Sequence, residues 1–175
     1  MKDSIMRLAP LAFLVLAMPV SGSPAAASWD VPGEIAGRAA VIDGDTIEVR
    51  GTRIRIAGID APEAAQVCTR ADGSPYRCGS AAAAFLDDML TGRTVVCIPS
   101  GTSYERIVAS CEVGGIDVGS AMVAAGWALD YARYSKGRYA ADEAGARTGS
   151  AGVWQGDFVR PDEWRRSDRG RGGRP

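Results

Sequence analysis

The sequence predicts a mainly β protein, a small closed barrel with about three helices packed outside it. Five short runs alternate apolar with polar residues and are joined by turns that contain glycine. One helical run interrupts these strands, and two more follow the last of them. The resulting order, β-β-β-α-β-β-α-α, fits a five-stranded barrel of the OB type.

The first three strands are predicted to follow one another through tight turns. Residues 33–43 alternate weakly, whereas 45–50 and 53–59 alternate aliphatic with charged side chains. The Gly-Thr dipeptide at 51–52 predicts a hairpin between the last two. Pro62 is expected to end the third strand, because proline has no N–H to donate to a sheet.

The remaining elements alternate between loops, helices and strands. Gly92 is predicted to stop the first helix, Gly79 or Ser80 to cap its start, and Asp117 to cap the second helix. In chain order we expect a loop at 64–79, a helix at 80–90, strands at 93–99 and 106–113, helices at 117–129 and 136–147, and an irregular segment at 152–164.

The N-terminal residues 1–27 are typical of a secretory signal peptide. A positive start precedes an apolar run, and a small-residue cleavage site ends at Ala27. The alternative is a membrane anchor, but the run is short for a span and is broken by Pro10 and Pro19. We therefore expect a secreted or periplasmic protein without a membrane association after cleavage.

The four cysteines of an exported chain favour two disulfides. Three pairings are possible, and we favour Cys68–Cys78, which closes a short loop, with Cys97–Cys111, which ties two neighbouring strands. The alternative is a zinc site. It is disfavoured because no cysteine pair has C-x-x-C spacing and the chain has no histidine.

The absence of histidine and the charge distribution restrict the chemistry. Mechanisms that use histidine are excluded, so a general base is expected to be a carboxylate and a metal to have oxygen ligands, as calcium or magnesium does. Residues 28–164, the predicted domain, have a net charge of −6, and residues 165–175, a predicted disordered basic tail, carry five arginines and one aspartate. Nucleic-acid binding would then be local, cation-assisted or helped by the tail.

Three acids and an arginine near the ends of the predicted strands could form a site. Asp45, Asp60 and Glu63 would repel one another unless a cation or an arginine such as Arg55 lay among them. Two carboxylates and the carbonyl of Ala61 suit a hard divalent ion. This would leave Glu63 as a base and the arginine for a phosphate, a set suited to phosphodiester hydrolysis.

Each motif alone also has an ordinary structural interpretation. Asp-Gly-Asp at 43–45 is a common turn, and it does not match a calcium-binding EF-hand loop because Glu48 and Ile54 stand where that loop needs Gly and Glu. Asp-Ala-Pro-Glu at 60–63 could be a simple strand exit, and Arg55 a solvated strand residue.

Three motifs in this order resemble the thermonuclease, or staphylococcal nuclease-like, domain: IDGDT at 42–46, RIAGIDAPE at 55–63 and YERIVA at 104–109. The resemblance runs from about residue 38 to residue 154. It implies an OB-fold barrel with three helices. It also implies a protein that uses calcium to hydrolyse phosphodiester bonds of DNA and RNA.

The resemblance also implies roles for individual residues. Tyr104 resembles a nucleotide-contacting tyrosine, and Tyr134, with Tyr131, is expected to stack near a base. The resemblance implies no metal-ligand role for Asp43. The further residues implied are the calcium ligands Asp45, Asp60 and the Ala61 carbonyl, the phosphate-contacting Arg55 and Arg106, and the general base Glu63.

One motif departs from the family pattern. The family's D-x-Y-G-R is here TSYER, with Thr102 in place of the acid and Glu105 in place of the glycine. Glu105 is expected to compete with a phosphate for Arg106.

The leading hypothesis is an exported, calcium-dependent nuclease, a monomer without a stable protein partner that prefers single-stranded or locally unpaired DNA and RNA. A second hypothesis is a non-catalytic OB-fold module that binds nucleic acid or protein. Relatives of that kind usually lose the acids or arginines that are present here. A third is a structural cell-envelope protein attached through its arginine-rich tail.

Overall fold

The computed structural model describes residues 33–104 and 106–171, and the side chains up to residue 167. The predicted signal peptide, Glu105 and the last four residues lie outside the described residues. None of the helices in the described part combines the length and the apolarity that crossing a bilayer requires.

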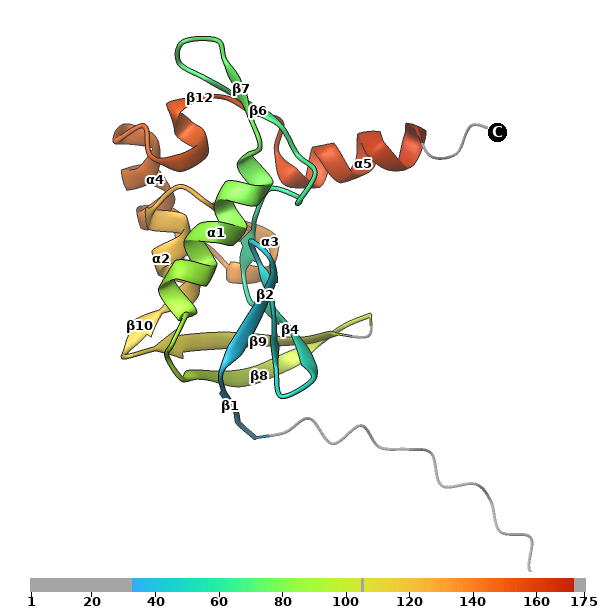
Figure 1. Cartoon of the computed structure of the whole chain (residues 1–175), viewed down its shortest axis with the longest axis vertical. Coiled ribbons are helices and arrows are strands. Elements are labelled where there is room, and N and C mark those ends of the chain that lie inside the picture. Colours follow the sequence, from blue (N-terminus) through green and yellow to red (C-terminus); the bar gives the residue numbers. More distant parts are fainter. Residues whose placement is uncertain (1–32, 105, 172–175) are drawn as a thin grey trace, which may run out of the picture. The chain divides into compact units, whose positions relative to one another are not determined.

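The largest sheet has seven strands in a mixed arrangement (Figure 1). Its hydrogen-bonded order is β1-β8-β9-β4-β3-β2, with β10 attached to β9, and only the β4–β9 pair is parallel. Its strands are β1 Ile35–Gly37, β2 Ala39–Asp43, β3 Thr46–Val49, β4 Thr52–Ile56, β8 Val95–Ser103, β9 Arg106–Val113 and β10 Ile116–Asp117.

Two small sheets complete the β structure. In one, β5 (Ile59–Asp60) pairs with β11 (Leu129–Asp130). In the other, β6 (Cys68–Arg70) lies between β7 (Pro75–Tyr76) and β12 (Gly156–Asp157).

The sheet-rich fold with several helices is confirmed, but the predicted count of five strands is wrong. The expected first strand is divided at Arg38, so that β1 pairs with β8 and β2 pairs with β3. Most of the additional strands have only two or three residues. Such strands are too short to show a period of two in the sequence.

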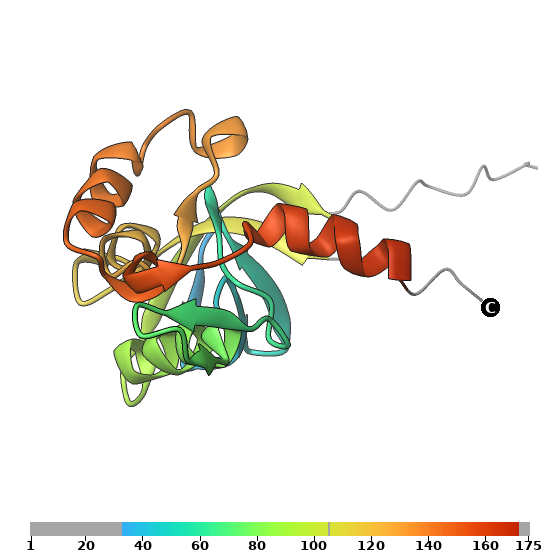
Figure 2. The ribbon, with the colours of Figure 1, turned by 90° about the horizontal axis from the view of Figure 1, so that it is seen from above.

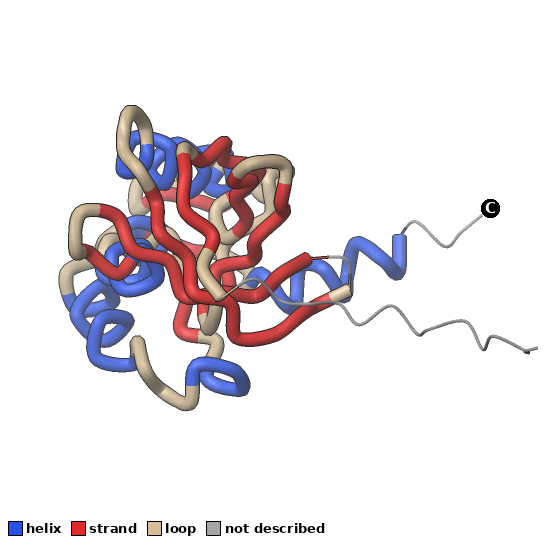
Figure 3. The backbone as a smooth tube through the Cα atoms, turned by 90° about the horizontal axis from the view of Figure 1, so that it is seen from below, coloured by secondary structure: helices blue, strands red, loops and turns tan. Residues whose placement is uncertain are grey.

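The helices surround the strands (Figure 3). Asp117 is the N-cap of α2, as predicted, and its Oδ1 accepts a bond from Ser120 N at 2.9 Å. The helix predicted at 136–147 is present but begins later, at Ala140, because Lys136 and Gly137 have positive φ, +58° and +82°; the short helix before them was not predicted. The helices are α1 Cys78–Leu90, α2 Val118–Ala124, α3 Ala132–Ser135, α4 Ala140–Thr148 and α5 Pro161–Arg171, with a 3₁₀ turn, η1, at Gly152–Gln155.

The core lies between the main sheet and α1. The alternating residues Ile47, Ile54 and Ile56 are buried, and α1 packs Leu86 and Leu90 against them. The start of α1 differs from the prediction: its N-cap is Arg77, without a side-chain capping bond.

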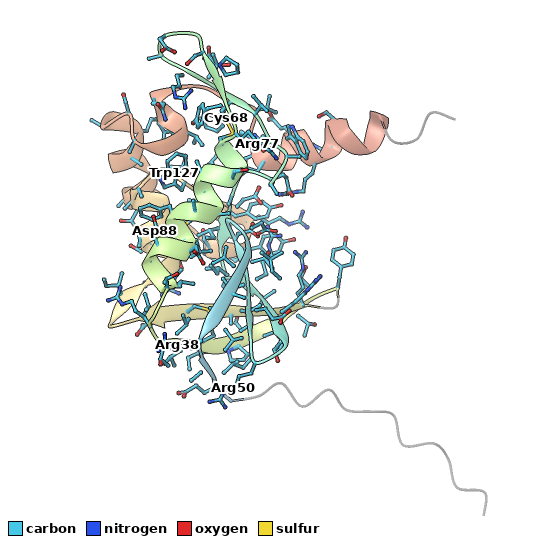
Figure 4. The ribbon with its side chains drawn as sticks, in the orientation of Figure 1. Arg38, Arg50, Cys68, Arg77, Asp88 and Trp127 are labelled. Carbon is cyan, nitrogen blue, oxygen red and sulfur yellow. A yellow bond between two sulfur atoms is a disulfide. The ribbon has the colours of Figure 1, made fainter. Side chains whose placement is uncertain are left out.

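Both predicted disulfides are confirmed. Cys97 and Cys111 are directly paired positions of β8 and β9, so this bond staples a hairpin. The Cys68–Cys78 bond joins β6 to the first residue of α1 (Figure 4) and lies in a second apolar cluster with Leu129.

The prediction of a disordered tail from Arg165 is corrected by α5, which continues to Arg171 (Figure 2). Pro161 at the first helical position, with Asp162 and Glu163 in the first turn, favours a helix start. The sequence lacks an apolar face here. The helix is instead linked to the domain through Arg165, which forms ion pairs with Asp60 and Glu63.

Candidate functional site

The Asp-Gly-Asp turn between β2 and β3 lies against the chain segment that follows β5. A Cβ atom at Gly44 would lie 2.7 Å from the Cβ of Ala61 and 2.9 Å from that of Ala82 in α1. Only glycine allows this close approach. Asp43 accepts a bond from the backbone N of Asp45 at 3.1 Å and so shapes the turn.

A second turn brings Arg55 and Asp60 together. Gly58, between β4 and β5, has φ +77°, a conformation that favours glycine. The Nη2 atom of Arg55 lies 2.8 Å from Asp45 Oδ2 and 3.0 Å from Asp60 Oδ1. The structure thus places these three predicted residues in contact.

Both aspartates are buried, each with 4% of its surface exposed. Burial raises the pKa of the Asp45 carboxyl to about 7, helped by the charges of Asp43 and Asp60 and opposed by Arg55. Burial also raises the pKa of Asp60, against the opposing charges of Arg165 and Arg55. The two carboxylates therefore need positive charge beside them to stay ionised.

Glu63 is fixed through its backbone. Its N–H donates to Gln66 Oε1 at 3.3 Å, and its carbonyl accepts from Gln66 N at 2.7 Å. Gln66 is fully buried and donates from Nε2 to the Val159 carbonyl at 2.6 Å. The loop that carries Glu63 is therefore linked to the segment that leads into α5.

Arg165 of α5 reaches both predicted acids. Its Nη1 lies 2.8 Å from Glu63 Oε1, and its Nη2 lies 2.9 Å from both carboxylate oxygens of Asp60. These bonds span 102 and 105 residues of sequence. One guanidinium thus bridges a predicted metal ligand and the predicted base.

Two cavities that share three arginines are lined by most of the predicted site residues. The smaller, of about 210 Å³, is lined by Asp43, Asp45, Arg55, Ala61, Pro62, Glu63, Arg106 and Arg165. Arg55, Arg106 and Arg165 also line a larger groove of about 710 Å³. Asp45, Glu63 and the three arginines therefore face these cavities, whereas Asp60 lines neither and is reached through its bonds to Arg55 and Arg165.

The groove is bordered by the tyrosines that the resemblance indicates. Tyr104, on the β8–β9 hairpin, is 93% exposed, and Tyr134 is also exposed. Tyr131 lies edge-on to Tyr134, with ring centroids 4.9 Å apart. In Figure 1 the β8–β9 hairpin and α5 project to the same side of the domain, and residues of both line the groove.

The donor set suits a hard cation, although the described residues contain no cluster of three or more acidic, histidine or cysteine side chains arranged to hold a metal. Oxygens of Asp45 and Asp60 converge on one point, because a single Arg55 nitrogen bonds both. A cation at these two carboxylates would need carbonyl or water oxygens to complete its shell, which calcium accepts.

Sequence reasoning missed Gln66 and Arg165. Gln66 is one polar residue in a loop and has no motif around it. Arg165 stands in a segment without apolar residues of helical spacing, so nothing local pointed to its contacts. No pattern in the sequence points to Gln66 or Arg165, because their contacts exist only in the folded chain.

A family model described as staphylococcal nuclease homologue matches residues 53–156, more than half of the chain. The chain belongs to this family. The family match includes the β4–β5 turn and β9, and it leaves Asp45 and Arg165 outside.

Two similar proteins carry different names. Over 124 residues the chain is 40% identical to the succinoglycan biosynthesis protein ExoI of Rhizobium meliloti (strain 1021), covering 69% of this chain and 65% of that protein. Over 155 residues it is 32% identical to the probable endonuclease lcl3 of Sclerotinia sclerotiorum, covering 79% of this chain and 56% of that protein. The chain spans less than two thirds of the length of either relative.

Proposed function

We propose that this protein is an exported, calcium-dependent nuclease that hydrolyses phosphodiester bonds of DNA and RNA. The observation that carries the proposal is one cavity lined by Asp45, Glu63, Arg55 and Arg106, with Asp60 bonded to Arg55 at its wall. Export rests on the signal-like residues 1–27. We further propose the closed barrel of the family's OB fold, since the outer strands of the main sheet, β1 and β2, are separated in the chain by Arg38 alone.

The side chains have complementary roles in this proposal. Asp45, Asp60 and the Ala61 carbonyl would hold calcium, which when bound supplies positive charge against the growing charge on the phosphate. Glu63 takes a proton from the attacking water as the water oxygen bonds to phosphorus; the bond from phosphorus to the leaving oxygen breaks, and that oxygen takes a proton from solvent. Arg55 and Arg106 donate N–H bonds to the phosphate oxygens, a geometry suited to the planar guanidinium.

The substrate would occupy the larger groove as a single strand. Tyr104, Tyr131 and Tyr134 present aromatic faces or edges there, and unpaired bases stack on such side chains. A base in a duplex is already stacked on its neighbours. We therefore propose a preference for single-stranded or locally unpaired nucleic acid, bound by a monomer.

Cleavage tests the proposal directly. The protein should cut labelled single-stranded DNA and RNA with calcium and stop cutting with EDTA. Glu63→Gln should lower the rate about 10² to 10⁴-fold, because the carboxamide cannot accept the proton. Glu112→Gln, an exposed carboxyl of β9, is the matched control and should cut normally.

A folded wild-type protein that leaves both substrates intact over a range of calcium concentrations would contradict the enzyme assignment.

The second candidate function is a binding module of the same family that does not cleave. Two observations favour it: Arg165 is bonded to the predicted base, and one relative is named for succinoglycan biosynthesis rather than for a nuclease. This candidate predicts retention of an intact labelled strand with calcium present, where the leading proposal predicts fragments.

A further inference from the structure

Arg165 is held to the candidate site by a helix that the family model does not cover. The match ends at residue 156, and α5 begins at Pro161. The helix is nevertheless anchored, because β12 pairs with β6, Gln66 bonds the Val159 carbonyl, and Pro161 is buried. The base of α5 is thus joined to the loop that carries Glu63.

The contacts of Arg165 are those of a counter-cation. Asp60 is buried, and its Oδ1 lies 3.0 Å from an Arg55 nitrogen and 2.9 Å from an Arg165 nitrogen. Its Oδ2 accepts the second bond from Arg165. Buried carboxylates are costly without such charge. The guanidiniums of Arg55 and Arg165 supply this charge at Asp60.

A divalent cation would need the same oxygens. Charge-assisted bonds to a guanidinium and ligation of a cation both use the carboxylate lone pairs, and the two positive charges repel at short distance. Release of Asp60 requires the guanidinium of Arg165 to leave the smaller cavity, which it lines. The larger groove, which Arg165 also lines, gives it room.

We propose that Arg165 is a built-in competitor of the divalent cation: it occupies Asp60 and Glu63 in the cation-free protein and must release Asp60 when the cation binds. This inference rests on the cation site of the proposed function. Its consequence is that Arg165 of α5 raises the calcium concentration needed to fill the site. When Arg165 leaves Asp60, it also releases Glu63 from their ion pair.

Calcium binding, measured by isothermal titration calorimetry on the whole chain, tests this independently of cleavage. Arg165→Gln should bind calcium about tenfold more tightly than the wild type, the size expected for one partly exposed charge-assisted pair. Arg166→Gln is the matched control. Arg166 is the next residue of α5, pairs with Asp162 outside both cavities, and should leave the calcium affinity unchanged.

A second variant protects the test from a folding defect. Arg165→Lys keeps the charge but cannot bridge two carboxylates through a fork of N–H groups, so its calcium affinity should lie between those of the wild type and Arg165→Gln. Circular dichroism of each variant confirms that it is folded.

The outcomes separate this inference from the nuclease assignment. Equal or weaker calcium binding by Arg165→Gln, or no calcium binding by either protein, overturns the competition. If the wild type cuts with calcium while Arg165→Gln binds calcium as the wild type does, only the competition fails. Tighter binding in a protein that never cuts supports the competition and refutes the nuclease.

Discussion

At the scale of single residues, Arg55 is the point on which the site depends. One of its nitrogens bonds two buried carboxylates, Asp45 in the β2–β3 turn and Asp60 at the end of β5, and its side chain is 18% exposed. The sequence predicted an arginine such as Arg55 among the acids, because Asp45, Asp60 and Glu63 would otherwise repel one another. In the structure Arg55 contacts Asp45 and Asp60. Its catalytic role stays a prediction.

Removal of this arginine should destabilise the protein even before any question of activity. In EDTA, Arg55→Gln should lower the free energy of unfolding by about 3 kcal/mol, because Asp45 and Asp60 lose the guanidinium that both of them bond. Urea denaturation measures this. Calcium bound at Asp45 and Asp60 should restore part of the lost free energy of unfolding. Arg53→Gln, exposed on the same strand, should change stability little, and an Arg55→Gln midpoint equal to that of the wild type would refute the argument.

At the scale of elements, the site is assembled by turns that pack on one another. The β2–β3 turn contacts Ala61 after β5 and Ala82 in α1 through Gly44. The β4–β5 turn uses Gly58 at positive φ and places Asp60 beside Arg55. These two glycines, which carry no chemistry themselves, bring the acidic residues of three segments together.

Gly44→Ala should therefore lower both stability and cleavage. A methyl group would lie 2.7 Å from Ala61 and force the turn outward, which we expect to cost about 1 to 3 kcal/mol and to displace Asp45. Gly145→Ala in α4, with no neighbour within 4 Å, is the control and should not destabilise the protein, since alanine favours helices. Thermal melting and the cleavage rate report the two effects. Normal values for both in Gly44→Ala would contradict the packing argument.

At the scale of the whole molecule, charge does not favour nucleic acid. The chain has a net charge of −1 at pH 7, so attraction must come from the few arginines that line the cavities. Arg55, Arg106 and Arg165 are the described arginines in both cavities. Binding should then be weak and modestly dependent on salt, unlike that of a protein with a broad basic face.

This dependence can be measured with the Glu63→Gln variant, which should bind without cutting. The logarithm of the association constant for a labelled single strand, plotted against the logarithm of salt concentration, should have a slope between about −1.5 and −2. That corresponds to two or three phosphate contacts. Fluorescence anisotropy in calcium gives the value. Adding Arg106→Gln should reduce the slope by about 0.7, and a slope unaffected by that change would exclude Arg106 from phosphate binding.

The sequence by itself determined the sheet-rich fold, both disulfides and the neighbourhood of Asp45, Arg55 and Asp60. Alternating strands, cysteine spacing and local motifs carry those signals over short stretches of chain. Only the tertiary structure decided the short strands, the helix α5 and the contacts of Gln66 and Arg165. The contacts of Gln66 and Arg165 depend on residues about a hundred positions apart, for example Arg165 and Asp60 at a separation of 105. No local pattern encodes such a pairing, because it exists only once the chain has folded.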